Sequence, residues 1–394
     1  MREVTLVLCL RDGSVLGALP AFPVAVPWWP EAAPVVAAAH AAHGVDVTIL
    51  RLLSGEPDRV PAGGRVTYLA EVGAAPRGLV AWAGDPNADE PLRLPYARPG
   101  GPAADLAWAD AELERRGTPR TAPAQQIRTW NLSSIWRLPL EGSSAWLKVV
   151  PPFFAHEGRM IARLESPAVP RLIAADGARV LLEEIPGPEG HEAAGAPLLA
   201  MVGLLVGLQL EWIGREEELI RLGLPDWRGG PLTDLAADVV SRAAAELQPA
   251  DVRVLERLLV GLAERMAGVS ACGIPDALVH GDFHRGNVRG PVNRLVLLDW
   301  GDSGVGHPLL DQAAFLDRIT AADRAAVSAE WSNLWRAAAP ASDPDRAARL
   351  LEPVAALRQA AIYLGFLDAI EPDERIYHAA DPAEWLTRAA DLSR

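Results

Sequence analysis

Residues 280–287 read "HGDFHRGN" and gather two histidines, an aspartate, an arginine and an asparagine between two apolar segments. Twelve residues after Asn287, the run "LVLLDWGDSG" places Asp299 directly behind four apolar residues. The pattern is therefore His-x-Asp-x4-Asn, an apolar strand, and then Asp-Trp-Gly. Polar residues in loops beside buried strands are typical of a reactive site, whereas a surface turn would leave this spacing unexplained.

A zinc site is one interpretation of the stretch, and it would use His280, Asp282 and His284 in alternation along a strand. The two glycines of the stretch oppose a strand, and no further cluster of histidine or cysteine follows in the sequence. Asn287 would also have no role. Zinc is therefore the less favoured interpretation.

Phosphoryl transfer is the other interpretation, and it uses all three polar positions. It requires a carboxylate near the attacking hydroxyl and oxygen ligands for the Mg²⁺ that bridges the nucleotide phosphates. A loop of this length can direct Asp282 at the hydroxyl and return Asn287 to the metal. Asp299, at the end of a strand, supplies a carboxylate for the same ion. The sequence therefore favours an ATP- and Mg²⁺-dependent reaction.

The only lysine of the chain strengthens this interpretation. Of 37 basic residues, 36 are arginine, and the single lysine is Lys148 in the strand-like "SSAWLKVV". An ammonium and a guanidinium are not interchangeable at a tight anion site, so a retained lysine indicates a specific role. The helical stretch that follows carries Glu157. A lysine on a third strand, paired with a helix glutamate, holds nucleotide phosphates in this chemistry. A solvent-facing lysine and glutamate are the alternatives.

The order of elements predicts the fold class. Residues 1–118 read as a hairpin, a helix ending at Gly44, further strands and a second helix, which indicates a small α/β domain. Residues 119–186 alternate strands with one helix, and residues 187–394 are mostly helical. We therefore predict three domains in an α+β chain: the N-terminal domain, and a two-lobed protein-kinase-like fold with a small sheet lobe and a helical lobe.

Charge and composition limit the partners. The net charge of −14 opposes nucleic acid or an anionic membrane as the main partner and would suit a cationic small molecule. The longest apolar run, residues 196–210, is too short and too interrupted for a membrane span and predicts a buried helix. Cys9 and Cys272 lie far apart, which indicates a reducing compartment. We expect a cytoplasmic protein, and the sequence leaves its oligomeric state open.

The chain from about residue 125 to 394 resembles the aminoglycoside phosphotransferase family, relatives of the choline kinases and more distantly of protein kinases. The stretches "LVHGDFHRGNV" and "LLDWGDSGVGHPLLDQA" carry the resemblance. It implies transfer of the γ-phosphate of ATP to a hydroxyl of a small molecule, such as an aminoglycoside-like antibiotic, an amino alcohol or a sugar. It also implies Asp282 as catalytic base, Asn287 and Asp299 as Mg²⁺ ligands, and Lys148 on the phosphates.

The resemblance implies further roles. Glu184 and Ile185, in "LEEIPG", would lie in the hinge that meets the adenine, and Asp311 would brace the catalytic loop from the protein interior. One departure from the family concerns the phosphates, because no glycine-rich loop stands between the first two strands. "TWNLSSIW" occupies that place, with Ser133 and Ser134 as the available donors.

Residues 1–118 resemble a Nudix-like fold, with "WWPEAAPVVAAAHAAHGVDV" where the catalytic box of that fold would lie. Alanines and histidines replace its acids, so we expect a degenerate, non-catalytic domain. A nucleotide-binding pseudokinase that works through this domain is therefore the alternative function. A protein kinase is disfavoured because no activation segment follows Asp299. Four acids are candidates for binding an amine of the acceptor: Glu211, Asp226, Asp302 and Asp317.

Overall fold

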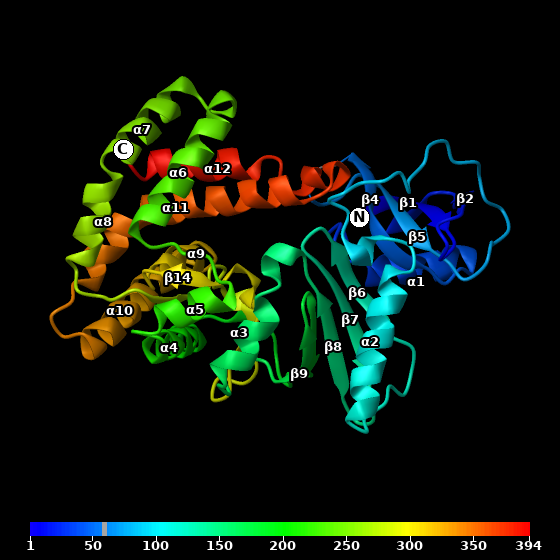
Figure 1. Ribbon diagram of the computed structural model, residues 1–394, viewed down its shortest axis with the longest axis horizontal. Helices are drawn as coiled ribbons and strands as arrows, with labels where there is room; N and C mark the ends of the chain where they lie inside the picture. The colour runs from blue at the N-terminus through cyan, green and yellow to red at the C-terminus, as the bar shows by residue number, and fades with distance from the viewer. Residues whose placement is uncertain (57–60) are drawn as a thin grey trace. The chain divides into compact units, whose positions relative to one another are not determined.

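The computed structural model describes residues 1–56 and 61–394 of the chain (Figure 1). Two compact units result, and the chain passes between them several times. The sheet unit comprises residues 1–158, 172–184 and 367–379. The helical unit comprises residues 159–171, 185–366 and 380–394. Each unit is described by itself.

The first sheet of the sheet unit has five strands in the order β2-β1-β5-β4, with β3 also paired to β1. β1 and β5 are parallel, and the other neighbours are antiparallel. Helix α1 ends at Gly44 in the left-handed conformation, as predicted. The core between this sheet and α1 is formed by apolar residues at alternate strand positions, such as Val4, Leu6 and Leu8. The elements are β1 (Arg2–Cys9), β2 (Val15–Ala18), β3 (Phe22–Val24), α1 (Ala33–His43), β4 (Thr48–Glu56) and β5 (Arg65–Glu71).

The second sheet is antiparallel, in the order β6-β7-β8-β10-β9. Helix α2 (Gly101–Arg115) shares a core with it through Ala109 and Leu113 (Figure 1). β9 and β10 form a hairpin, and β6 and β7 are joined within the segment "TWNLSSIW". The chain reverses there at Asn131, without the glycine or proline that marks most turns. The strands are β6 (Gln125–Trp130), β7 (Ser133–Pro139), β8 (Ser144–Val149), β9 (Leu172–Asp176) and β10 (Arg179–Glu183).

Strand β6 ties the two sheets into one unit. The side-chain amide of Gln126 accepts a hydrogen bond from the backbone N–H of Ile49 and donates one to its carbonyl oxygen, at 2.9 and 2.7 Å. Beside it, the N–H of Ala32 donates to the carbonyl oxygen of Ile127 at 3.0 Å. The edge of β6 is thus hydrogen-bonded to the N-terminal residues, which covers an otherwise exposed strand edge.

The helical unit contains most of the helices and two short strand pairs. The apolar run 196–210 forms a buried helix, as predicted, while residues 249–270 form two helices that break at Gly261. Helices α3 and α11 each contain a boundary between the units. The elements are α3 (Glu157–Leu164), α4 (Ala196–Glu211), α5 (Glu216–Leu222), α6 (Gly229–Ala243), α7 (Pro249–Val260), α8 (Leu262–Ser270), β11 (Ala277–Val279), β12 (Val288–Arg289), β13 (Val296–Leu297), β14 (Gly304–Gly306), α9 (Leu310–Asp317), α10 (Ala321–Ala338), α11 (Pro344–Ala369) and α12 (Asp381–Asp391).

Helix α11 is long and apolar enough to cross a membrane by length and composition alone. Half of its apolar window is buried inside the structure, however, and the core helix of a soluble protein has the same properties. Helices α4 and α5 reach the same threshold only as a pair that is bent by 95°. These helices are therefore weak indications of a membrane span.

Candidate active site

The loop after β11 is held by a buried carboxylate of α9. Oδ2 of Asp311 accepts a hydrogen bond from the backbone N–H of His280, and Oδ1 accepts one from that of Gly281, at 2.9 and 2.8 Å. This confirms Asp311 as the predicted brace. Gly281 has φ +90°, and a Cβ there would lie 1.8 Å from the carbonyl oxygen of Asp302. Only glycine therefore fits between the brace and the loop's neighbour.

Arg358 of α11 supports the same loop and was not predicted. Its buried guanidinium donates a 2.5 Å hydrogen bond to the carbonyl oxygen of Gly281 and lies over the ring of Trp227 at 4.2 Å. Burial lowers the pKa of Arg358, and the nearby carboxylate of Asp311 opposes that change. The sequence signal was one arginine within the apolar stretch "VAALRQAA".

His280 orients the loop from inside the core. Its side chain is fully buried, its Nε2 lies 2.9 Å from the carbonyl oxygen of Leu298, and its ring centroid is 4.7 Å from that of Trp300. Burial lowers the pKa of His280, which keeps the ring neutral. With Nε2 committed to a backbone carbonyl, His280 is an orienting residue, which opposes the zinc interpretation.

Asp282 lies in the loop with both carboxylate oxygens occupied. Oδ1 accepts a hydrogen bond from Nη1 of Arg318 at 3.1 Å, while Oδ2 lies 3.3 Å from Nε2 of His284 and 3.2 Å from Nδ2 of Asn287. Nδ1 of His284 accepts from the N–H of Gly286, so Nε2 carries a proton to donate. Arg318 follows α9, 36 residues away, and no sequence signal linked it to Asp282.

These partners decide the charge of Asp282. Burial raises the pKa of its carboxyl group, but the hydrogen bond from His284 and the positive charge of Arg318 together lower it to about 2. Asp282 is therefore an anion at every pH at which the protein would work. Such a carboxylate can accept a hydrogen bond from a hydroxyl and orient it, and it is a weak base toward the free hydroxyl.

The hairpin of β12 and β13 brings Asn287 next to Leu298, the residue before Asp299. Val288 pairs with Leu297, and the N–H of Leu298 donates to the carbonyl oxygen of Asn287 at 2.7 Å. The side-chain N–H₂ of Asn287 is used by Asp282, so the amide oxygen is the atom with which Asn287 could bind a metal. Asp299 has φ +64°, a strained conformation common at functional sites. One amide oxygen and one carboxylate suit Mg²⁺, which prefers oxygen ligands.

The sheet unit carries the predicted lysine pair. Nζ of Lys148 lies 2.8 Å from Oε1 of Glu157, and the two side chains are only 14% and 2% exposed. Lys148 belongs to β8, the central strand, where its neighbours are Ile135 of β7 and Val180 of β10. A lysine buried in this way is a fixed point charge.

The predicted serine donors lie inside the sheet. Ser133 and Ser134 begin β7 and are buried. The hydroxyl of Ser133 accepts the indole N–H of Trp130 at 3.2 Å, and that of Ser134 accepts the indole N–H of Trp136 at 3.0 Å. Trp130 pairs directly with Ser133, so the connection between β6 and β7 is a turn of two residues. Neither hydroxyl stands on an extended loop.

The predicted hinge follows β10. The backbone N–H of Glu184 donates to the carbonyl oxygen of Ser144 at 3.1 Å, and its Oε2 accepts the indole N–H of Trp146 at 2.8 Å. Ile185 comes next and is half-buried. Glu184 is therefore tied to the sheet by both its backbone and its side chain.

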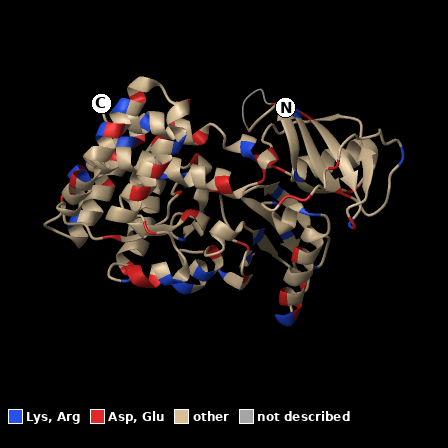
Figure 2. Cartoon of the chain, turned by 45° about the horizontal axis from the view of Figure 1, so that its top comes forward, with Lys and Arg blue, Asp and Glu red and all other residues tan. Residues whose placement is uncertain are grey.

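Two of the acids expected to bind an amine are already paired with arginine. Asp226 accepts two side-chain hydrogen bonds from Arg228, which lower the pKa of its carboxyl group, and Asp317 lies 2.5 Å from Arg388. Figure 2 shows acidic and basic residues interspersed along the helices. Asp226 and Asp317 are therefore already paired with a cation of the protein itself.

The family model described as the phosphotransferase enzyme family matches residues 126–350, more than half of the chain. No curated protein matches. The chain is similar in structure to a macrolide 2'-phosphotransferase type I, with a TM-score of 0.52 and 18% identity over 72% of this chain and 97% of that one.

Two more solved structures are similar. A proposed aminoglycoside phosphotransferase of Ralstonia eutropha JMP134 has a TM-score of 0.52 and 15% identity, over 73% of this chain and 98% of that one. The GDP complex of aminoglycoside 2'-phosphotransferase-IIIa has a TM-score of 0.50 and 13% identity, over 73% and 97%. At such identities the likeness concerns the fold, and the predicted two-lobed, protein-kinase-like α+β fold is confirmed.

Proposed function

The chain belongs to the phosphotransferase enzyme family, and from this premise we propose that it transfers the γ-phosphoryl group of ATP, with Mg²⁺, to a hydroxyl of a small molecule. The observation that carries the proposal is the loop of Asp282 and Asn287, braced by Asp311 and followed by Asp299. The carboxylate of Asp282 is ionised and hydrogen-bonded to Asn287, and Asp299 follows the next strand. The GDP complex of a structural neighbour supports a nucleotide as donor.

Each residue has a distinct role in this proposal. Lys148, held by Glu157, would contact the α- and β-phosphates, while Glu184 and Ile185 would meet the adenine. Asn287 and Asp299 would hold Mg²⁺, which would neutralise the charge of the phosphates. Asp282 would orient the acceptor hydroxyl. The transition state of phosphoryl transfer is loose, so a weakly basic carboxylate suffices to receive the proton late in the reaction.

Arg318 restricts the acceptor. Its guanidinium lies at Oδ1 of Asp282, while the other carboxylate oxygen faces His284 and Asn287. A hydroxyl that reaches Oδ1 therefore stands next to a positive charge, which disfavours an ammonium group on the adjacent carbon. An aminoglycoside-like antibiotic, a macrolide or a sugar, whose reacting hydroxyl can lie away from an amine, is favoured over a short amino alcohol.

The alternative is a pseudokinase that binds nucleotide and acts through residues 1–118, the part for which we keep the Nudix-like, non-catalytic interpretation. The complete set of Lys148, Asp282, Asn287 and Asp299 favours an enzyme. We propose the cytoplasm as its location, with no nucleic-acid or membrane partner.

Calorimetry of ATP binding, with and without Mg²⁺, tests the proposal on the wild type and on Asp299→Ala. We expect Mg²⁺-dependent binding that the variant loses, and ADP release when a suitable hydroxyl compound is added. Asp238→Ala, on the exposed face of α6, is the control. If the wild type binds neither ATP nor GTP, the enzyme proposal is wrong. If it binds ATP but transfers to none of the acceptor classes above, the pseudokinase takes its place.

A further inference from the structure

The turn between β6 and β7 lies where the family would place a glycine-rich loop, and the side chain of its first residue, Asn131, points into the protein. Asn131 is 3% exposed. Its Nδ2 donates to the backbone carbonyl oxygen of Glu374 at 3.2 Å, and its Oδ1 lies 3.3 Å from Nε2 of His378. A segment near the C-terminus therefore binds this turn through two side-chain contacts. We call residues 371–378 the strap.

The strap also encloses the residue before the turn. The ring of Trp130 lies edge-on to that of Tyr377, with centroids 5.6 Å apart, and 5.5 Å from the ring of His378. The hydroxyl of Tyr96 donates to the carbonyl oxygen of Trp130 at 2.8 Å. Aromatic contacts and a hydrogen bond to the backbone thus restrict the turn from several sides.

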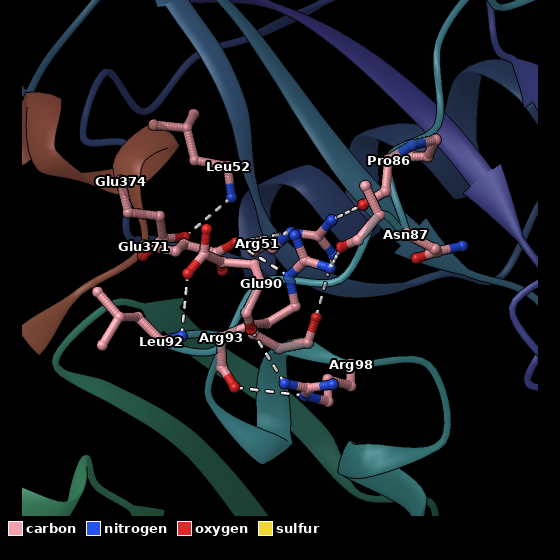
Figure 3. A network of polar contacts seen from close by, with 12 residues as sticks. Arg51, Leu52, Pro86, Asn87, Glu90, Leu92, Arg93, Arg98, Glu371 and Glu374 are labelled. Carbon is pink, nitrogen blue, oxygen red and sulfur yellow. Dashed lines mark hydrogen bonds and ion pairs between the residues drawn. The ribbon is translucent and has the colours of Figure 1, made fainter.

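Buried acidic and basic side chains anchor the strap to the N-terminal residues of the sheet unit (Figure 3). Oε2 of Glu371 lies 2.9 Å from Nε of Arg93 and 3.5 Å from Nε of Arg51, whose side chain is 1% exposed. Oε1 of Glu374 accepts a hydrogen bond from the backbone N–H of Leu52 at 3.1 Å. Because a buried charge that loses its partner is strongly unfavourable, the pairs of Glu371 with Arg93 and Arg51 hold the strap in one position.

The turn lies close to the lysine that would hold the phosphates. Ile135 of β7 is opposite Lys148 of β8, and Ser133, at the turn, is two residues away from Ile135. At the usual rise along a strand, this is about 7 Å. The turn and Lys148 therefore lie near the same end of the second sheet.

We propose that the strap compensates for the absent glycine-rich loop by holding the β6–β7 turn in a fixed conformation. Asn131 would be the positioning residue that fixes this turn for contact with the phosphates of the nucleotide. A glycine-rich loop covers phosphates by folding over them, which a two-residue turn cannot do. A short turn contributes only if its backbone is fixed in advance, and the strap supplies that restraint. The N-terminal residues 1–118 then serve the nucleotide site as the anchor of the strap.

The inference rests on the proposed function, and its test separates the two. ATP affinity in the presence of Mg²⁺ is measured by calorimetry for the wild type, Asn131→Ala, His378→Ala and His378→Gln. Asp373→Asn and Arg375→Ala, exposed positions of the same strap, are the controls. Amide hydrogen exchange of residues 130–134 is measured on the same proteins without nucleotide.

We expect Asn131→Ala and His378→Ala to bind ATP about tenfold more weakly, equivalent to about 1.4 kcal/mol. His378→Gln, which keeps an N–H donor, should recover most of the affinity. Exchange at the turn should be faster in the two alanine variants and unchanged in the controls. If both alanine variants keep the ATP affinity of the wild type, the role of the strap is wrong, while the proposed function still stands. A wild type that binds no ATP overturns the proposed function as well.

Discussion

Nη1 of Arg318 lies 3.1 Å from Oδ1 of Asp282 and contributes to the low pKa of that carboxyl group, about 2. Protonated Asp282 cannot take up the proton of the acceptor hydroxyl, and its low pKa confines this loss to very acid solution. The wild-type rate should therefore be flat, as far as Asp282 is concerned, from pH 5 to 8. Arg318→Gln removes the charge and should raise that pKa, so an acid limb should appear at higher pH. Profiles of kcat/KM against pH that coincide for both proteins contradict this assignment.

Removal of the Asp282 carboxylate should separate binding from transfer. Asp282→Ala leaves Lys148, Glu157, Asn287 and Asp299 in place, so ATP binding should stay within a few-fold of the wild type. Transfer should fall by roughly 10²–10⁴-fold, the usual contribution of a positioned acid–base group. Single-turnover rates at saturating ATP measure the loss. A variant with near-wild-type turnover would show that another group orients the hydroxyl.

We expect that even arginine cannot replace Lys148 in its buried pair with Glu157. Lys148→Arg keeps the charge, but a planar guanidinium does not fit the place of a compact ammonium on a central strand. We expect its KM for ATP to rise by about 10–100-fold, the value of a charge-assisted hydrogen bond of roughly 1.5–3 kcal/mol. Glu157→Gln should have a smaller effect in the same direction. Arg179→Lys, on the neighbouring strand, is the matched control, and equal KM values for Lys148→Arg and this control would oppose a phosphate role.

The candidate site residues that the sequence could reveal are those whose proposed chemistry requires fixed residue types within a short segment. Asp282 and Asn287 share one loop, and Asp299 follows the next strand, so their spacing survives in the sequence. The pairing of Lys148 with Glu157 was equally accessible, because nine residues separate them and only one lysine exists. In both cases the spacing of residues along a short stretch of sequence was sufficient for the prediction.

Residues that act through tertiary contacts were not accessible. Arg318 reaches Asp282 across 36 residues, and Arg358 reaches Gly281 across 77. In a chain with 36 arginines, neither is distinguishable from its neighbours. The strap is a stronger case, because Asn131 and Glu374 are 243 residues apart. The partners that fix the turn at Asn131 were not accessible for the same reason, because Glu374 and His378 lie far along the chain.

Glu374 should make the stability of the protein depend on pH. Burial, and then the charge of Glu371, raise the pKa of Glu374 from 4.5 to about 8, against the opposing effects of the Leu52 N–H and Arg51. The folded state therefore keeps a proton that the unfolded state releases above pH 4.5. The stabilisation is complete below that pH and is lost as the pH rises to about 8. Glu374 also interacts electrostatically with four further ionisable groups: Tyr68, Asp373, Tyr96 and Tyr377.

Glu374→Gln removes the titration and keeps an oxygen that can accept from Leu52. The difference in the free energy of unfolding, wild type minus variant, should fall by roughly 3–5 kcal/mol between pH 5 and 8. Denaturant unfolding at several pH values measures it. The pKa of Glu371 is also raised, by burial, and it titrates in both proteins, so only the difference reports on Glu374. Parallel curves for the two proteins would mean that Glu374 titrates normally.

Gly281→Ala should distort the loop of residues 280–287 without removing a functional group. The added Cβ would meet the carbonyl oxygen of Asp302 at 1.8 Å, and φ +90° is strained for alanine. The loop must shift, and the hydrogen bonds of Gly281 to Asp311 and Arg358 weaken with it. We expect a loss of about 1–3 kcal/mol in stability, and a loss in kcat that exceeds the change in ATP affinity. Gly142→Ala, in an open turn with nothing within 4 Å, has a similar positive φ and serves as control for the strain. If both variants keep wild-type kcat, Asp282 does not depend on the geometry of Gly281. If both lose stability but only Gly281→Ala loses kcat, the contact with Asp302 is what places the carboxylate.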